Sequence, residues 1–314
     1  MVWRRDMGEN EEFHRQLHGS RIEGSRPIYN FFVFVWRRIR DGRGVRFSIV
    51  TPSFRQLDWL RLCVRSIEDQ GVEPEHIIQD AGTGQELENW VENSTKARLF
   101  VESDGGIYDA LNRGFARTSG DVMAWLNCDE QYLPGALAAV EAEFAARPEL
   151  DVLLADNLIV DGEGNYLAHR FSLVPNVSQC WWRFPVSSCA LFFRRRVWRP
   201  FDTRWKSAGD WWWFMAMLQR GAKIGVMRRF VATFAETGEN LGLSPVTEQE
   251  HGAIAAARPW WARAFAPAIL LRHRARMLAS GVNRLEPFNY RIFTRTENER
   301  RIFHVARPTS KWRR

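Results

Sequence analysis

Apolar runs of strand length alternate with longer amphipathic stretches from Val45 to about residue 146. The strand-like runs cover residues 46–51, 76–79, 97–102 and 121–126. The stretches that follow them place apolar residues at helical spacing and begin at Leu57, Gln85, Ile107 and Pro134. This alternation predicts an α/β fold, with a mixed, mainly parallel sheet flanked by helices.

The pattern changes after Asp151. Residues 152–160 and 166–171 flank the segment DGEGN and predict a hairpin with a long glycine turn. We also expect strand regions at residues 184–197 and 223–234, with a helix at residues 211–220 between them. From Gly238 the chain is basic and rich in tryptophan, and we expect it to be helical.

These changes divide the chain into three parts. Residues 1–43 are polar and basic apart from a short aromatic patch, and they predict an N-terminal extension. Residues 44–237 carry the strand and helix pattern and predict one domain of two halves, 44–150 and 151–237. Residues 238–314 predict a C-terminal helical extension with basic and aromatic surface.

The composition allows a sizeable core and excludes several classes of protein. Of 314 residues, 45% are hydrophobic and 26% charged, so the chain is not disordered overall. Its net charge of +7 favours anionic partners, but it does not distinguish among phosphate groups, nucleic acids and anionic membranes. The four cysteines show neither zinc spacing nor a disulfide framework, which fits a reducing cytosol. The apolar run at residues 28–36 is too short to span a bilayer and lacks a signal-cleavage site, so secreted and polytopic membrane proteins are excluded.

Polar segments follow all four of the first strands, at residues 51–53, 80–84, 102–106 and 127–130. Because the carboxyl ends of strands in an open α/β sheet line one crevice, the acidic residues of these segments should converge there. Asp129 and Glu130 are adjacent carboxylates, which repel each other unless a cation or a donor network offsets them. The pair therefore fits either a Mg²⁺ site or a solvated acidic turn.

Two more strand ends carry candidate ligand-binding residues, and each of them has a functional and a structural interpretation. Asp80, with glycine at 82, could accept the imide N–H of a uracil ring or form an Asx-turn. Asp104 ends a strand, and Arg113 follows on the next helix. Arg113 could meet a diphosphate or pair with a pocket carboxylate, and the spacing fits an acidic helix cap with a surface arginine equally well.

Asp210 stands in the first turn of the helix expected at 211–220. The helix dipole keeps a carboxylate there ionised and able to accept a hydroxyl proton. Ser207 and Asp210 also match a capping box, and the two roles are compatible.

Five segments of the chain resemble family-2 glycosyltransferases with a GT-A fold, and in particular the bacterial polysaccharide-biosynthesis members. The segments are FSIVTPS at 47–53, IIQDAGTG at 77–84, SDGGIYDALNRG at 103–114, LNCDE at 126–130 and FDTRWKSAGDW at 201–211. The resemblance covers about residues 45–237, and the order and spacing of the segments make it specific.

The resemblance implies a nucleotide-sugar half at 44–150 and an acceptor half at 151–237. It places the donor at Thr51, Pro52, Ser53, Asp80, Gly82, Asp104, Arg113, Asn127 and Asp129. Asp129 would hold Mg²⁺ or Mn²⁺, and Asp210 would be the general base. Asn127 stands where many members carry a first metal-binding Asp, although similar polysaccharide enzymes often have Asn there too. Gly209 replaces the usual Glu or Ala, and only TGEN at 237–240 represents the expected glycine-serine loop.

The implied reaction is an inverting, metal-dependent transfer of a sugar from a nucleotide-diphosphate sugar, by default a UDP-sugar. The acceptor would be a hydroxyl of a glycan or lipid-linked molecule in bacterial surface polysaccharide synthesis. Asp210 would remove its proton, and the leaving group needs no protein acid.

The arginines and tryptophans of residues 258–277 suit a helix at the anionic inner face of the cytoplasmic membrane, or a helical pair packed on the catalytic domain. Two rival hypotheses are a degenerate sugar-nucleotide-binding protein and a basic, tryptophan-rich nucleic-acid-binding protein. The expected crevice contains several carboxylates, whose negative charge disfavours nucleic acid as a partner.

Overall fold

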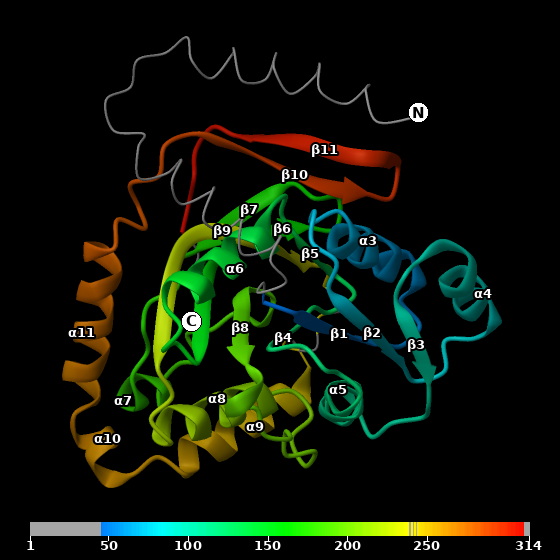
Figure 1. The fold of residues 1–314 in the computed structure, drawn as a ribbon. Coiled ribbons are helices and arrows are strands. Elements are labelled where there is room, and N and C mark those ends of the chain that lie inside the picture. Colours follow the sequence, from blue (N-terminus) through cyan, green and yellow to red (C-terminus); the bar gives the residue numbers. More distant parts are fainter. Residues whose placement is uncertain (1–44, 239, 241, 243, 311–314) are drawn as a thin grey trace. The chain divides into compact units, whose positions relative to one another are not determined.

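Within the described residues, which are 45–310 except 239, 241 and 243, nine strands of the computed structural model form one mixed sheet (Figure 1). The strands are β1 (Phe47–Ser53), β2 (Glu75–Asp80), β3 (Arg98–Val101), β4 (Val122–Trp125), β5 (Glu130–Tyr132), β6 (Val152–Asp161), β7 (Tyr166–Arg170), β8 (Leu191–Arg194) and β9 (Ile224–Glu236). Their order is β3-β2-β1-β4-β8-β6-β9-β5, and β7 pairs with β6. The predicted fold class is confirmed. The N-terminal extension predicted at 1–43 lies outside the described residues.

The first four strands of the sheet end at one edge. β1 pairs in parallel with β2 and β4, and β2 pairs in parallel with β3. Ser53 lies opposite Asp80, which in turn lies opposite Val101. Since the strands run in the same direction, the polar segments that follow them emerge together. β8 then pairs antiparallel with both β4 and β6.

Helices cover both faces of this sheet, α3 (Leu57–Glu68) and α6 (Ala136–Ala146) on one, and α5 (Ile107–Ala116) and α8 (Gly209–Gln219) on the other. Figure 1 shows α3 above the strands and α5 and α8 below them. Val122 and Ala124 of β4 pack toward α3 and α6, whereas Met123 and Trp125 pack toward α5 and α8. The strand is continuously apolar because both of its faces are covered.

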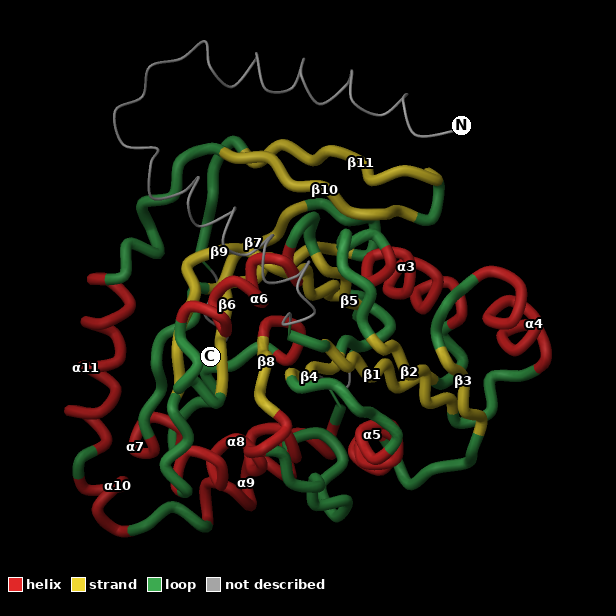
Figure 2. Tube along the Cα trace, viewed as in Figure 1, coloured by secondary structure: helices red, strands yellow, loops and turns green. Residues whose placement is uncertain are grey.

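The elements predicted for residues 44–150 are present (Figure 2), and α4 (Gln85–Ser94) begins at the predicted residue. The short strand β5 and the one-turn helix α7 (Val177–Cys180) were not predicted. Within the strand region expected at 184–197, only Leu191–Arg194 is a strand, flanked by 3₁₀ turns at 188–190 and 195–197. Pro185 has no N–H for a ladder, so pairing cannot run unbroken from the start of that region.

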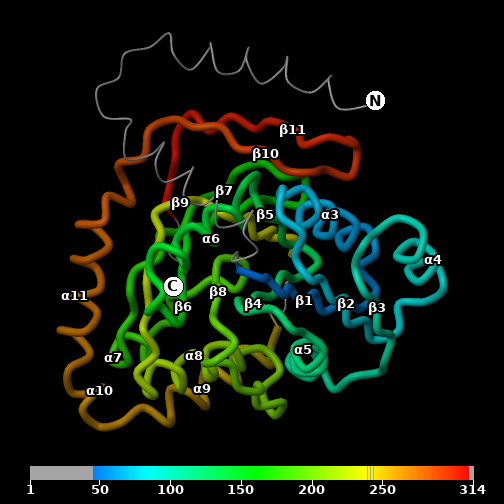
Figure 3. Tube along the Cα trace, in the orientation of Figure 1, coloured from blue at the N-terminus to red at the C-terminus, as the bar shows by residue number. Residues whose placement is uncertain are grey.

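The C-terminal region begins with α9 (Pro245–Ala256), α10 (Trp260–Ala264) and α11 (Ala266–Ala279), as expected. It then forms an antiparallel hairpin of β10 (Phe288–Thr294) and β11 (Glu297–Val305), coloured orange to red in Figure 3, so the prediction of a wholly helical region is wrong. Phe288, Tyr290 and Ile292 alternate at period two, which is the strand pattern. The Phe293 backbone and the Gln131 side-chain amide exchange hydrogen bonds of 2.9 and 3.0 Å, which tie the hairpin to β5.

The described residues contain four buried, unbridged cysteines, in agreement with the absence of a disulfide framework. Among the helices described, none has the length and apolar character needed to cross a membrane.

Candidate functional site

A cleft of about 740 Å³ opens where β1 and β4 end and where α5 and α8 begin. Six predicted site residues line it, namely Pro52, Ser53, Asp104, Asn127, Asp129 and Asp210. Four others do not line it, namely Thr51, Asp80, Gly82 and Arg113. The fold therefore brings the acidic candidates from both halves of the chain to one cavity.

Asp129 lies in the loop between β4 and β5 and lines the cleft. Its Oδ2 accepts a hydrogen bond of 2.9 Å from Asn240 Nδ2. Burial raises the pKa of Asp129, and the bond from Asn240 acts in the opposite direction. Asn127 Oδ1 is buried and has no hydrogen-bond partner among the described residues. A divalent cation fits this donor set, because it would use the unpartnered oxygen and offset the buried charge.

Within the described residues no cluster of three or more His, Cys, Asp or Glu side chains could hold a metal by itself. A cation at Asp129 would therefore need oxygens from a ligand as well, which is how Mg²⁺ is usually held beside phosphates.

Glu130 does not line the cleft, and its hydrogen bonds hold the loop that carries Asp129. It is fully buried, and its carboxylate accepts bonds from Asn127 N at 2.8 Å and Ser188 Oγ at 3.0 Å. Burial, and after it the neighbouring charge of Asp129, raise the pKa of Glu130 to about 8. Neither of the two predicted settings, solvated turn or paired metal ligands, describes Glu130.

Asp210 lies in the first turn of α8 and lines the same cleft. Its Oδ1 accepts bonds from Trp211 N at 2.8 Å and Tyr108 Oη at 3.1 Å. Burial raises the pKa of Asp210 to about 6, while both hydrogen bonds oppose that shift. A carboxylate whose pKa lies just below neutral is ionised at pH 7 and still basic enough to accept a proton.

Asp80 and Gly82 belong to the turn at the end of β2, and neither lines the cleft. The Asp80 carboxylate accepts bonds from Gly82 N, Thr83 N and Thr83 Oγ1 at 2.6–2.9 Å, which is the Asx-turn interpretation. Gly82 has a φ of 105°, a conformation that favours glycine. Thr51 is also fully buried, with Oγ1 2.9 Å from His76 Nε2. A contact between Asp80 and a nucleobase stays a prediction.

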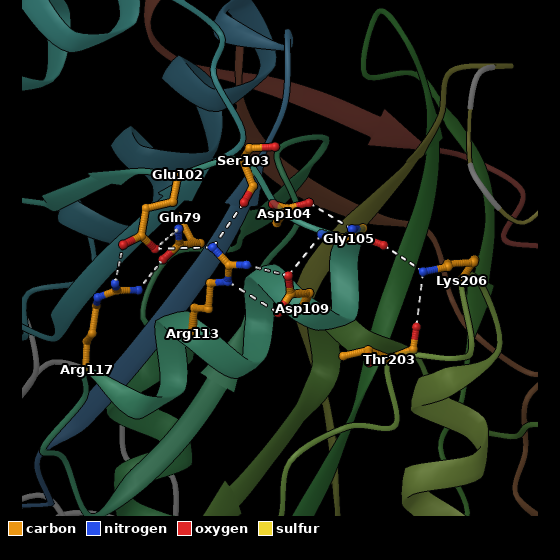
Figure 4. Close-up of polar contacts among 11 residues, drawn as sticks. Gln79, Glu102, Ser103, Asp104, Gly105, Asp109, Arg113, Arg117, Thr203 and Lys206 are labelled. Carbon is orange, nitrogen blue, oxygen red and sulfur yellow. Dashed lines mark hydrogen bonds and ion pairs between the residues drawn. The ribbon is translucent and has the colours of Figure 1, made fainter.

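Asp104 and Arg113 belong to a polar network around the start of α5 (Figure 4). Asp104 Oδ1 accepts Gly106 N at 2.8 Å, and Arg113 donates to Asp109 at 2.8 Å and to Ser103 O at 3.0 Å. Asp109 lies in the first turn of α5 and does not line the cleft, so this pair matches the acidic helix cap with a surface arginine, and a contact of Arg113 with a diphosphate stays a prediction. The pKa of Asp109 is lowered by its bond from Gly105 N and by Arg113.

Comparisons with known proteins identify the family. Residues 48–199 match the family model described as glycosyl transferase family 2. These residues, just under half of the chain, are therefore a glycosyl transferase family 2 domain. An uncharacterized glycosyltransferase of Mycobacterium tuberculosis is 36% identical over 101 residues, 30% of this chain and 38% of the relative. The O-antigen biosynthesis protein RfbC of Myxococcus xanthus is 32% identical over 140 residues, 42% of this chain and 11% of the relative. The matches thus span well under half the length of these relatives.

Two solved structures share the fold. The crystal structure of S. aureus TarS 1-349 in complex with UDP-GlcNAc has a TM-score of 0.55 and 16% identity, over 67% of this chain and 64% of that one. The S. aureus TarS structure has a TM-score of 0.53 and 14% identity, over 83% of this chain and 60% of that one.

The glycosyltransferase cleft also contains residues that the sequence analysis missed. Phe54 lines it with 53% of its surface exposed, next to Arg55, which has a φ of 52°. Tyr108 lines it and bonds to Asp210. Its position four residues after Asp104 on an expected helix was the available signal. The sequence analysis gave Asn240 only as part of the segment 237–240, and nothing in the sequence predicted its hydrogen bond to Asp129.

The capping-box interpretation of Ser207 is wrong. Helix α8 begins at Gly209 with Ala208 as N-cap and no side-chain cap, and Ser207 Oγ instead lies 2.6 Å from Thr247 Oγ1. The glycine at 209 also has a structural reason. A Cβ atom there would lie 2.6 Å from the Tyr108 ring, which contacts Asp210. The Ala or Glu common in the family would displace that ring.

Proposed function

We propose that the protein is an inverting, metal-dependent glycosyltransferase that uses a nucleotide-diphosphate sugar. The observation that carries the proposal is the placement of Asp129 and Asp210 in one cleft, each with a raised pKa. A UDP-sugar is the proposed donor, supported by the UDP-GlcNAc complex of TarS. A glycan or lipid-linked acceptor in surface polysaccharide synthesis is proposed from the name of the RfbC relative.

Each residue has one task in this proposal. Pro52, Ser53 and Asp104 of the nucleotide-sugar half line the donor side of the cleft. Asp129, with the free Oδ1 of Asn127, would hold Mg²⁺ or Mn²⁺. When bound, the cation offsets charge on the departing diphosphate.

Asp210 accepts the proton of the acceptor hydroxyl as that oxygen attacks the anomeric carbon from the face opposite the diphosphate. Tyr108 and Trp211 N fix the orientation of its carboxylate through the bonds described above. Because the nucleophile and the leaving group lie on opposite faces, the anomeric configuration inverts.

The first experiment is a thermal-shift series with UDP, GDP, dTDP and CDP, each with and without Mn²⁺. A ligand at about a hundred times its dissociation constant adds roughly 2.7 kcal/mol of stability. We expect one nucleotide to stabilise the protein only with metal, and Asp129→Ala to abolish this while Asp210→Asn retains it. If no nucleotide shifts the unfolding temperature, donor binding is refuted.

Transfer assays then separate an enzyme from a degenerate binding protein. Loss of transfer in Asp210→Asn with unchanged nucleotide binding supports the base assignment. Nucleotide binding by the wild type without transfer to any glycan or lipid-linked acceptor would instead favour the degenerate protein.

We propose peripheral contact with the inner membrane face through residues 258–277. The inner side of α11 packs on the domain through Ile269, His273 and Met277, which are buried. Leu271 on its outer side is 70% exposed, and Trp260 at the start of α10 is 77% exposed. Apolar side chains among arginines suit an anionic lipid surface.

Flotation with phosphatidylglycerol vesicles tests this contact. Leu271→Glu with Leu278→Glu should abolish binding, whereas Ile302→Glu on the distant hairpin, 57% exposed, should not. Equal binding of all three proteins, or none by the wild type, refutes the membrane contact.

A further inference from the structure

Glu250 of α9 fastens the loop that precedes the candidate base. One of its carboxylate oxygens accepts Lys206 N at 2.5 Å. The other accepts Ser207 N at 2.9 Å and Ala208 N at 2.7 Å. These are the last backbone N–H groups before α8, whose N-terminus lacks a side-chain cap of its own. A carboxylate with several N–H donors is a strong, directional anchor.

Other contacts hold the same loop from a second side. Tyr108 Oη lies 2.6 Å from Ser207 O, and Lys206 Nζ donates to Gly105 O at 2.7 Å (Figure 4). The loop is thereby connected to the donor side of the cleft through α5 and to the C-terminal region through Glu250. Asp210 lies two residues after the last of these anchored amides.

We propose that Glu250 is a positioning residue of the glycosyl-transfer reaction, which orients the loop of Asp210 and strengthens Asp210 as a base. The proposal rests on the function proposed above. It assigns a task to α9, which follows the residues matched by the family model by more than forty positions.

Glu250 affects Asp210 through its negative charge as well as through the hydrogen bonds that hold the loop. Burial is the largest cause of the raised pKa of Asp210, and the negative charge of Glu250 acts in the same direction. Besides Glu250, the titratable or charged groups in contact with Asp210, its loop or its neighbour Trp211 include Tyr108 of α5, Lys206 of the loop and His251 of α9, whose ring centroid lies 5.2 Å from that of Trp211. A carboxylate held beside another carboxylate binds a proton more tightly and is the stronger base.

The variant Glu250→Gln removes the charge and keeps one acceptor oxygen, and Glu248→Gln on the exposed side of the same helix is its matched control. At pH 8, where Asp210 is ionised in every variant, we expect Glu250→Gln to lower kcat about tenfold through misplacement of the base. The KM for the donor should change less than about twofold, since the donor side is untouched. The acid limb of the pH profile should move to lower pH by roughly half a unit.

A titration that does not need turnover separates this inference from the proposed function. The Asp210 carboxyl carbon is followed by ¹³C NMR in the wild type, Glu250→Gln and Glu248→Gln, with Asp210→Asn to assign the signal. A lower pKa of Asp210 in Glu250→Gln alone supports the inference, even if no acceptor is found. The same pKa of Asp210 in all three folded proteins, or an acid limb that does not move, overturns it. Absence of transfer by the wild type refutes only the proposed function.

Discussion

Transfer activity should fall about tenfold between pH 7 and pH 5 because Asp210 becomes protonated. With a pKa of about 6, the carboxyl is about 90% ionised at pH 7 and about 10% ionised at pH 5. The acid limb of kcat/KM reports this group in the free enzyme. The assay is a sugar-transfer time course at saturating Mn²⁺, across pH 4.5 to 8.5 in buffers of constant ionic strength.

Asp129 is a second carboxylate in the cleft whose pKa is raised, so the limb must be assigned. A proton and a metal compete for Asp129, and a limb due to this residue moves to lower pH as Mn²⁺ increases. A limb due to Asp210 does not depend on metal concentration once the cation is saturating.

The matched perturbation is Tyr108→Phe, which keeps the ring and removes the hydroxyl. The hydrogen bond from Tyr108 lowers the pKa of Asp210, so its loss should raise that pKa and move the limb to higher pH. This direction is opposite to that expected for Glu250→Gln. A profile that stays flat from pH 7 to pH 5, or a Tyr108→Phe limb at lower pH, refutes Asp210 as the titrating base.

Two further predictions concern stability. The folded-state pKa of Asp210 exceeds its ordinary value of 3.8, so ionisation of this group destabilises the fold as pH rises from about 4 to 6. The free energy of unfolding of Asp210→Asn should therefore exceed that of the wild type at pH 7.5, by at most about 3 kcal/mol, and equal it near pH 4, as measured by calorimetry. Gly209→Ala should lose about 1–3 kcal/mol in urea unfolding because its Cβ meets the Tyr108 ring, whereas Gly252→Ala on α9, with nothing within 4 Å, should gain about 0.5–1 kcal/mol; equal effects would refute the steric argument.

The sequence was sufficient to locate the cleft because parallel strands place their ends at one edge whatever side chains they carry. Asp104 and Asp129 could therefore be assigned to one cavity from strand ends alone, and both line it. The helices expected on the faces of the sheet are also present, and they cover both faces of β4.

The sequence could not show which polar residues at those ends point into the cleft. Asp80 and Arg113 belong to the quoted motifs just as Asp129 does. The Asp80 carboxylate is nevertheless hydrogen-bonded within its own turn, and Arg113 forms an i,i+4 ion pair with Asp109. Whether such a side chain meets a ligand depends on rotamers and neighbours that a motif does not specify. Contacts made over long distances in sequence were equally hidden, since Asn240 reaches Asp129 across 111 positions.

The C-terminal region is best regarded as part of the catalytic unit, and this affects how membrane contact should be tested. Its residues Asn240 and Gly242 line the cleft, and Glu250 anchors the loop of Asp210. A chain ending near Gly238 would remove all three together with α11, so lost vesicle binding could follow from a damaged fold. Substitutions at Leu271 and Leu278, whose side chains are 70% and 59% exposed, remove the apolar surface and leave these contacts in place. If the membrane contact only localises the enzyme, the double variant should keep the wild-type kcat toward a soluble acceptor while losing vesicle binding. A matching loss of kcat would show that α11 also supports the cleft.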